Sequence, residues 1–302
     1  MSSPAPASAA EPPETGLQPA GVIYAASGPD RYAALAARSA ASFKRHNPGI
    51  PVDLYSDRPR DLPVFDRIHV LQDAWFRSRI DAMRIARFER TLMLDSDTMV
   101  VADIADVFQL LDRFDIALAH DYRPNGTLGF TPFRKQLPAA FPQFNGGVIA
   151  IRKTDRTDRF LLDWARAVRA HDIGRDQPSL RETLWDSDLR IATLPEAYNL
   201  VQVSNLRSWT WSDLAPRIIH SPHFHAQFDR YSRVADPVAE RLGPGLAWRM
   251  QLLRRSDGAL AALEGRVPDR PGRAERARGA LGVAAAMPGR LLRALGRRLK
   301  RS

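Results

Sequence analysis

Short apolar runs alternate with amphipathic stretches along most of the chain. The runs that have strand length lie at residues 21–26, 51–57, 67–71, 91–95, 115–119, 147–151 and 190–194. Apolar side chains recur at helical spacing over residues 32–43, 78–89, 156–170 and 176–186, and in the second of these stretches they include Ile80, Met83 and Ile85. Strands that alternate with helices predict an α/β domain with a mostly parallel central sheet and helices on both faces. Ligands of such sheets bind at the carboxyl ends of the strands.

The two ends of the chain depart from this pattern. Residues 1–20 are rich in Ala, Pro, Ser and Glu without apolar periodicity, so we expect them to be disordered. Residues 251–302 hold 13 Lys and Arg against 4 Asp and Glu, whereas the first 250 residues hold 31 against 30. The formal net charge of +10 therefore belongs to a basic, partly helical tail, and the remaining residues 21–250 form one domain. Because that domain is nearly neutral, we do not expect it to bind nucleic acid.

The end of the tail has the pattern of a helix that lies on a membrane. From Pro288 onward Leu291, Leu292, Leu295 and Leu299 fall on one helical face, and Arg and Lys occupy the rest. Such a helix is attracted to an anionic membrane surface. A solvated basic tail and a contact with nucleic acid are the alternatives.

Composition limits the chemistry and the compartment. The chain contains no Cys, which excludes disulfides, thiolate metal sites and cysteine nucleophiles. It has no apolar run of about 18 residues, so we expect no transmembrane helix. The N-terminus lacks a basic segment followed by an apolar core, so we expect no secretory signal. These features predict a cytoplasmic protein, peripheral at the inner face of the cell membrane if the tail binds there.

An acidic pair follows the apolar run at 91–95. Asp95 and Asp97 flank Ser96, and residues two positions apart at a strand edge point to the same side. Two such carboxylates can share one hard divalent cation, which in turn can neutralise a diphosphate leaving group. A solvated turn after a strand is the alternative. No glycine-rich phosphate motif is present, neither G-x-x-x-x-G-K-[ST] nor G-x-G-x-x-G after the first strand, so another group would have to hold the phosphates of a bound nucleotide.

The segment LMLDSDTMVVADIADVF, in which the pair lies, resembles the family-8 glycosyltransferases, which include glycogenin and bacterial lipopolysaccharide galactosyltransferases. The resemblance extends over residues 21–225 as an ordered series of motifs. It implies a GT-A-type fold and the transfer of a sugar, with retention, from a nucleotide-diphosphate sugar, favouring UDP-hexose. It also implies that Asp95 and Asp97 bind Mn²⁺ (or Mg²⁺), and that Asp97 lies near the donor ribose or sugar.

Motifs upstream of the acidic pair resemble the donor-binding parts of the family. In SGPDRYAALAARSAASFKRHN the resemblance implies that Tyr32 stacks on uracil, while Tyr24, Ala25 and Ala26 supply backbone contacts. For Tyr32, packing within the helix is the alternative. Arg79, in SRIDAMRIARFER, occupies the place of a family Lys or Arg that contacts the donor phosphate or sugar. An arginine fork can bind phosphate in a bidentate way, and an exposed helix arginine is the alternative.

Motifs downstream of the pair complete the predicted site. FNGGVIAI resembles the family's strand entrance, where Asn145 would touch the donor sugar and the glycines would allow close backbone approach; these are Gly146 and Gly147. DQPSL implies that Asp176 and Gln177 lie by the anomeric carbon and the acceptor, and Asp176 is also a candidate helix N-cap. LPEAYNL matches a segment whose Tyr198 and Asn199 we interpret as structural support.

His220, in RIIHSPHFH, is the predicted third metal ligand. A neutral imidazole with two carboxylates suits a first-row divalent ion. Here the chain departs from the family, which continues H-x-x-G-x-x-K-P-W and uses the Gly and Lys to hold the diphosphate. Arg79, His223 and Arg230 are the candidates to replace them. Otherwise we expect His223 and His225 to be surface or acceptor-side residues.

The sequence therefore predicts a hexosyltransferase that uses a nucleotide-sugar donor and a glycan or lipid-linked acceptor. A non-catalytic module that binds a nucleotide-sugar or a membrane is the first alternative. The second is a phosphatase of the haloacid dehalogenase class, which also places D-x-D after an apolar strand. That class needs a lysine, for which Lys135 and Lys153 are the candidates, and it usually carries D-x-D on the first strand.

Overall fold

A computed structural model describes residues 17–124, 126–127, 131–171, 176–269 and 272. Most of the predicted disordered segment and the predicted membrane helix lie outside these residues. The strands are β1 Gln18–Ala26, β2 Val52–Ser56, β3 Arg67–Val70, β4 Phe88–Leu94, β5 Thr98–Val100, β6 Ile116–His120, β7 Phe144–Arg152, β8 Ile191–Leu194 and β9 Ile218–His220. The helices are α1 Asp30–His46, α2 Ser78–Ile85, α3 Val107–Leu110, α5 Asp155–His171, α6 Gln177–Trp185, α7 Pro222–Ala226, α8 Phe228–Ser232, α9 Pro237–Ser256 and α10 Gly258–Leu263, with 3-10 turns η1 Glu196–Tyr198 and η2 Val203–Arg207.

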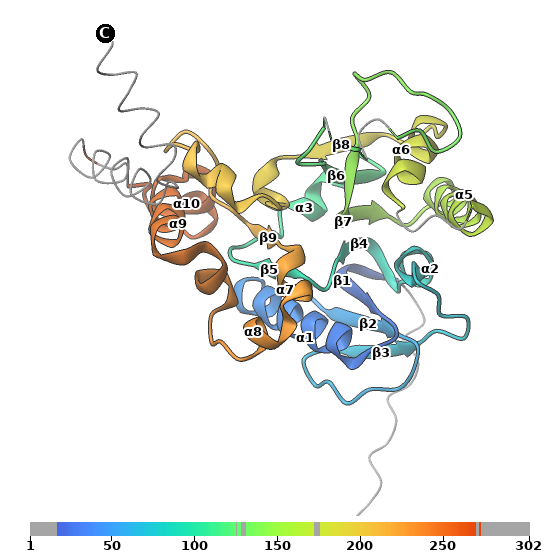
Figure 1. Ribbon diagram of the computed structural model, residues 1–302, viewed down its shortest axis with the longest axis horizontal. Coiled ribbons are helices and arrows are strands. Elements are labelled where there is room, and N and C mark those ends of the chain that lie inside the picture. The colour runs from blue at the N-terminus through green and yellow to red at the C-terminus, as the bar shows by residue number, and fades with distance from the viewer. Residues whose placement is uncertain (1–16, 125, 128–130, 172–175, 270–271, 273–302) are drawn as a thin grey trace, which may run out of the picture.

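A seven-stranded sheet in the order β3-β2-β1-β4-β7-β6-β8 forms the centre of the fold (Figure 1). Neighbours pair in parallel except at β7, which runs antiparallel to both β4 and β6. The predicted α/β fold with a mostly parallel central sheet is therefore confirmed. Because β1, β4 and β6 run in one direction and β7 in the other, the ends of β1, β4 and β6 meet the beginning of β7 at one edge.

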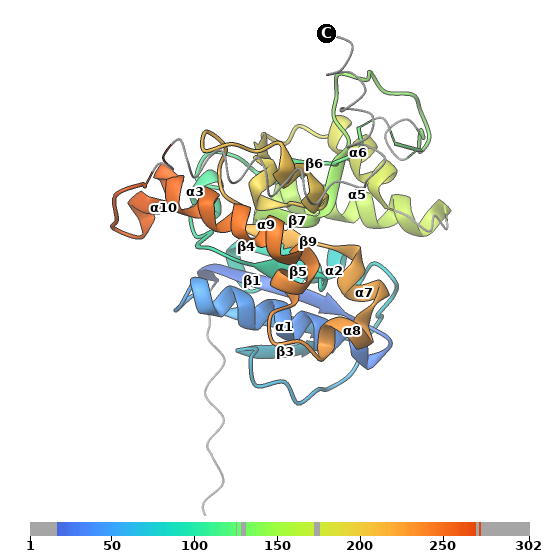
Figure 2. The same ribbon diagram turned by 60° about the vertical axis from the view of Figure 1, so that its left-hand side comes forward.

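Helices cover both faces of this sheet, as the sequence predicts (Figure 2). On one face, α1 and α3 pack with Phe43 and Phe108 against alternate residues of the strands. On the other face, α2, α5 and α6 contribute Met83, Trp164 and Leu180. The apolar runs are nearly continuous because strands between two helical layers are buried on both sides.

A second, two-stranded sheet pairs β5 with β9 in antiparallel register, with Thr98 opposite His220. The helices α7, α8 and α9 pack against it around a core that includes Phe224, Tyr231 and Leu253. This small sheet matters for function because it joins the turn after β4 to a segment more than 120 positions further along the chain. No helix among the described residues is both long and apolar enough to cross a membrane.

The folded domain continues beyond the predicted boundary at residue 250, which falls inside α9. Asp257, buried at the start of α10, forms a 2.8 Å ion pair with the buried Arg217 just before β9. Asp257 also accepts hydrogen bonds from the backbone N–H groups of Ala215 and Leu260. Composition could not reveal this boundary, because residues 251–269 are rich in basic side chains although they belong to helices whose apolar side chains are buried.

Two further predicted boundaries are corrected. The helix predicted over 78–89 ends at Ile85, whose side chain is exposed, and Phe88 begins β4. Gln18 donates a backbone hydrogen bond to Arg87 and Phe88 pairs with Gln18, so sheet formation ends the helix early. The same pairing makes residues 18–20 part of β1, although the sequence places them in the N-terminal segment.

Candidate active site

The turn after β4 and the end of β9 form one cluster of metal-ligating groups. The Asp95 carbonyl accepts hydrogen bonds from the Thr98 amide (3.2 Å) and the Thr98 hydroxyl (2.7 Å), which closes the turn that carries both aspartates. The pairing of β5 with β9 then places His220 opposite Thr98. A backbone hydrogen bond of 3.0 Å from Ser221 to the Asp97 carbonyl locks the two segments together.

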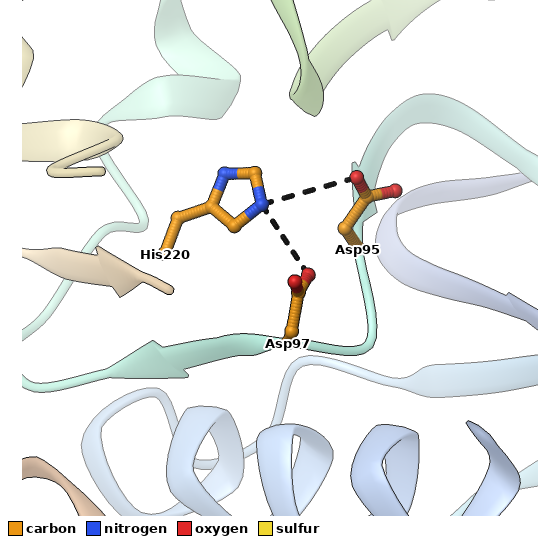
Figure 3. Close-up of side chains that lie close together, drawn as sticks. All are labelled: Asp95, Asp97 and His220. Carbon is orange, nitrogen blue, oxygen red and sulfur yellow. Dashed lines mark ion pairs between the residues drawn. The ribbon is translucent and has the colours of Figure 1, made fainter. Parts of the chain in front are cut away.

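One ligand atom from each of Asp95, Asp97 and His220 lies within 4.8 Å of the other two (Figure 3). The His220 Nε2 atom is 3.3 Å from Asp97 Oδ1 and 4.0 Å from Asp95 Oδ2. Two carboxylates and one imidazole at these separations can converge on a single first-row divalent ion such as Mn²⁺, or on Mg²⁺. The structure therefore brings the three predicted ligands together.

The charges of this cluster favour binding of a cation. Burial would raise the pKa of Asp97, but the adjacent imidazole of His220 outweighs it and holds that pKa below its ordinary value. Burial would also lower the pKa of His220, but the Asp97 carboxylate outweighs burial and raises it. Asp97 is thus ionised, and a bound metal would replace the proton that His220 attracts in the metal-free protein.

A chain of amide side chains orients His220 through Nδ1, the ring nitrogen that does not face the carboxylates. The His220 Nδ1–H donates to Asn199 Oδ1 at 2.9 Å, which leaves the Nε2 lone pair directed to the carboxylates. Asn199 Nδ2 in turn donates to Asn145 Oδ1 at 2.9 Å, and that oxygen also accepts from the Gly147 amide at 3.0 Å. Such partners fix the tautomer and the ring orientation of a metal ligand. Asn145, for which the sequence predicts a contact with donor sugar, has its amide oxygen engaged in this support.

Gly147 allows the imidazole to approach the sheet. A Cβ atom at this position would lie 2.2 Å from His220 Cε1 and 3.0 Å from Asp95 Oδ2, far inside normal contact distance. The Gly147 carbonyl also accepts a 2.8 Å hydrogen bond from the Asp95 amide. The close approach that the sequence predicts here is therefore made by a metal-site side chain of the protein itself.

Arg79 connects the acidic pair to Asp176. Its Nη1 donates to Asp95 Oδ1 at 2.6 Å and its Nη2 to Asp176 Oδ2 at 2.5 Å. Burial would lower the pKa of Arg79, but Asp176 and Asp95 together outweigh it and raise that pKa. Burial would raise the pKa of Asp176, and Arg79 followed by Arg77 holds it below its ordinary value instead. Arg79 is a central part of the site and not an exposed helix arginine.

Gln177 contacts a carboxylate that the sequence analysis missed. Its Nε2 donates to Asp121 Oδ2 at 2.7 Å and to the Phe144 carbonyl at 3.2 Å. Asp121 is buried and comes directly after β6, at the same edge of the sheet as Asp95. The position of Asp121 directly after a predicted strand could have marked it as a site residue, because ligands bind at the carboxyl ends of strands in this fold class.

A cavity of about 360 Å³ lies beside the cluster and contains most of the predicted donor-binding residues. Its walls are formed by the end of β1, the start of α1, the segment 75–79 and the turn after β4. The predicted residues that line it are Ala25, Ala26, Tyr32, Arg79, Asp95, Ser96 and Asp97. Trp75 and Phe76 also line the cavity and were not predicted.

His225, for which the sequence predicts a place at the surface or on the acceptor side, also lines this cavity. Its ring stacks on Tyr32, with ring centroids 4.7 Å apart and an angle of 12° between the planes. The short helix α7, which begins two positions after His220, carries His225 to the wall. Tyr32 is thus a cavity residue, and one of its ring faces is covered by an imidazole.

Other candidates lie elsewhere. The Tyr24 side chain is buried in the core and bonds to Ser39, so only its backbone remains available to a ligand. His223 is exposed and does not line the cavity, and the exposed Arg230 pairs with Glu240 at 2.5 Å. Neither is placed to replace the family's phosphate-binding residues.

The phosphatase alternative loses support from the geometry. The acidic pair follows β4, a central strand that is not the first in the chain. Lys153 donates to the backbone carbonyls of Arg84 and Ala86, and Lys135 pairs with Asp186. Neither lysine lines the cavity, so neither can neutralise a phosphate bound at Asp95 and Asp97.

Residues 89–226 match the family model described as nucleotide-diphospho-sugar transferase. The matched segment runs from β4 to α7, and it contains the three clustered ligands together with Asn145 and Asp176. The match covers somewhat less than half of the chain and shows similarity to that family over these residues. No curated protein sequence matches the chain.

Several solved glycosyltransferase structures are similar to this chain. GlyE of Streptococcus pneumoniae TIGR4 is 18% identical, with a TM-score of 0.46, and the similarity covers 68% of this chain and 54% of GlyE. The bifunctional glycosyltransferase WbbM is 18% identical, with a TM-score of 0.47 over 70% of this chain and 47% of WbbM. The galactosyltransferase LgtC, solved with donor and acceptor sugar analogs, is 13% identical, with a TM-score of 0.47 over 67% of this chain and 87% of LgtC. This chain spans only about half the length of GlyE and WbbM, and with TM-scores below 0.5 none of the three bears on its function.

Proposed function

We propose that this protein is a metal-dependent glycosyltransferase that transfers a sugar from a nucleotide-diphosphate sugar to a glycan or lipid-linked acceptor. The donor we propose is a UDP-hexose, and the reaction proceeds with retention at the anomeric carbon, as in the family-8 enzymes that the motifs resemble. The metal is Mn²⁺ or Mg²⁺. The convergence of Asp95, Asp97 and His220 beside the cavity that Tyr32 lines is the observation that carries this proposal.

The metal ligands come from segments more than 120 positions apart, and each is held by a second layer of contacts. Asn199 holds the imidazole, Arg79 holds Asp95, and the β5–β9 pairing holds the turn. A solvated turn with two chance carboxylates needs none of these supports. When bound, the cation supplies positive charge that stabilises the diphosphate as it leaves.

The residues of the chain position the donor for this chemistry. The cavity beside the cluster accommodates the nucleotide, with Tyr32 as the stacking surface for the base. Arg79 orients Asp176, and Asp121 orients Gln177, so these two side chains present a polar surface at the edge of the sheet. We assign the sugar and the acceptor hydroxyl to this surface, where exclusion of water and fixed dipoles favour the transfer.

A panel of nucleotide-sugars tests the proposal. We expect Mn²⁺ to promote hydrolysis of one donor in the absence of acceptor. Asp97→Asn is expected to lower this rate at least about 100-fold because it removes a metal-binding charge. Asp229→Asn, at an exposed position away from the cluster, is the matched control and should retain the wild-type rate. Full activity of Asp97→Asn would refute the proposal.

A module that binds the donor without catalysis is the second candidate. The observation that favours it is the sequence HSPHFHAQF after β9, which lacks the Gly and Lys of the family pattern. Such a module would bind a nucleotide-sugar with Mn²⁺ and leave it intact in the presence of every acceptor. Turnover in the panel distinguishes the two functions.

A further inference from the structure

Few polar side chains are available to a ligand in the cavity beside the Asp95, Asp97 and His220 cluster. Arg79 already bridges Asp95 and Asp176, and Arg77 lies 3.4 Å from Asp176. Ser78 exchanges hydrogen bonds with the backbone of Trp75. The guanidinium and hydroxyl groups on this wall therefore serve mainly to hold the site together.

Among the residues that line the cavity without binding a carboxylate, two atoms are buried and lack a hydrogen-bond partner, namely His225 Nε2 and Ser27 Oγ. Arg79 Nε, in the same wall, lacks one as well. A buried polar atom without a partner costs about 1–3 kcal/mol, so most such atoms in folded proteins are satisfied. Two of them in residues that line one cavity indicate a polar ligand that completes their bonding. Ser27 follows β1, while His225 belongs to the segment that follows the metal ligand His220.

The position of His225 points to the phosphates of the ligand. Its ring stacks on Tyr32, the proposed surface for the base. It also lines the same cavity as Asp95 and Asp97, two of the proposed metal ligands. The cavity wall that includes His225 thus also holds the base surface and two metal ligands, and a diphosphate must span the interval between those two parts.

We propose that His225 binds the diphosphate of the nucleotide donor by donating a hydrogen bond from Nε2–H. This inference rests on the proposed function. The ring lines the cavity that Asp95 and Asp97 also line, so a diphosphate bound at the metal would lie in the same cavity as His225. His225 thus takes the place left by the missing lysine, which neither His223 nor Arg230 is positioned to fill.

His225→Phe tests this role because it keeps an aromatic ring for Tyr32 and removes the nitrogen. His223→Phe is the matched control, since His223 belongs to the same short helix but lies outside the cavity. Binding of UDP and of inorganic pyrophosphate, each with Mn²⁺, is measured by calorimetry for the wild type and both variants. Binding of Mn²⁺ alone, followed by electron paramagnetic resonance, reports whether the metal site is intact.

A hydrogen bond to a charged group is worth enough for its loss to weaken binding about 10-fold or more. We expect His225→Phe to lose about 10-fold for both UDP and pyrophosphate, with Mn²⁺ binding unchanged and His223→Phe equal to the wild type. Equal affinity of His225→Phe and wild type for both ligands overturns the inference, as does a loss for UDP without a loss for pyrophosphate, which would assign the ring to the base. Failure of the wild type to bind any nucleoside diphosphate with Mn²⁺ would instead refute the proposed function itself.

Discussion

Replacement of Gly147 by Ala should abolish tight metal binding although all three metal ligands are retained. The added Cβ would lie 2.2 Å from His220 Cε1 and 2.7 Å from its Nδ1, whereas ordinary contact begins at 3.4 Å. The ring must therefore move by roughly 1 Å, but metal–ligand distances tolerate only about 0.2 Å. His220 is buried and bonded to Asn199, so it cannot move without losing that bond.

We expect Gly147→Ala to weaken Mn²⁺ binding about 100-fold, at the upper end of what disturbed ligand orientation costs. Overpacking should also lower the free energy of unfolding by about 1–3 kcal/mol. Calorimetric titration with Mn²⁺ measures the first effect, and urea unfolding measures the second.

The neighbouring Gly146→Ala is the matched control. Its Cβ would lie 3.0 Å from Arg79 Nη2, a contact that a shift of a few tenths of an ångström relieves, and none of its three nearest atoms belongs to a metal ligand. We expect a change in Mn²⁺ affinity below about 5-fold, because the arginine can adjust. If Gly147→Ala binds Mn²⁺ as tightly as the wild type, His220 does not occupy the position that makes it a ligand, and the reasoning fails.

Three further predictions concern contacts made by Asn199, Gln177 and Asp257. Asn199→Ala removes the acceptor of the His220 Nδ1–H and should weaken Mn²⁺ binding about 10- to 100-fold, as titration would show; an unchanged affinity would mean that the amide does not orient the ring. Gln177→Leu leaves the buried Asp121 carboxylate without its side-chain donor, so donor turnover should fall while Mn²⁺ affinity stays the same; parallel losses of both would show that Gln177 acts on the metal instead. Asp257→Ala leaves Arg217 as a buried unpaired charge and should lower the free energy of unfolding by about 3–5 kcal/mol in urea; a loss below about 1 kcal/mol would contradict this. Burial would raise the pKa of Asp257, but Arg217 together with the backbone N–H groups of Leu260 and Ala215 outweighs burial and holds that pKa below its ordinary value. The loss of stability in the variant should therefore be constant above about pH 4 and shrink as the pH falls through the lowered pKa.

Much of the framework was predictable from the sequence because the governing interactions are local. Strands enclosed by two helical layers must be apolar throughout, so their runs stand out. Asp95 and Asp97 stand out because they interrupt such a run, and His220 because it follows two buried isoleucines.

The remainder depends on contacts between distant segments, which no local pattern encodes. Arg79 has the sequence context of an exposed helix residue, and only the arrangement of α2 beside β4 and α6 shows that it joins Asp95 to Asp176. Asn145 has its amide oxygen bound by Asn199, a residue 54 positions away. The end of the domain was misplaced because the Arg217–Asp257 pair that secures α10 looks like ordinary surface charge in the sequence.

The central claim is that one cation binds between two carboxylates of the turn after β4 and the imidazole at the end of β9. A crystal grown with Mn²⁺ and UDP, measured above the manganese absorption edge, tests it most directly. We predict one anomalous peak about 2.0–2.3 Å from Asp95, Asp97 and His220 Nε2, with the diphosphate against it. A manganese peak elsewhere, or a bound UDP with no metal among these three side chains, would contradict the account.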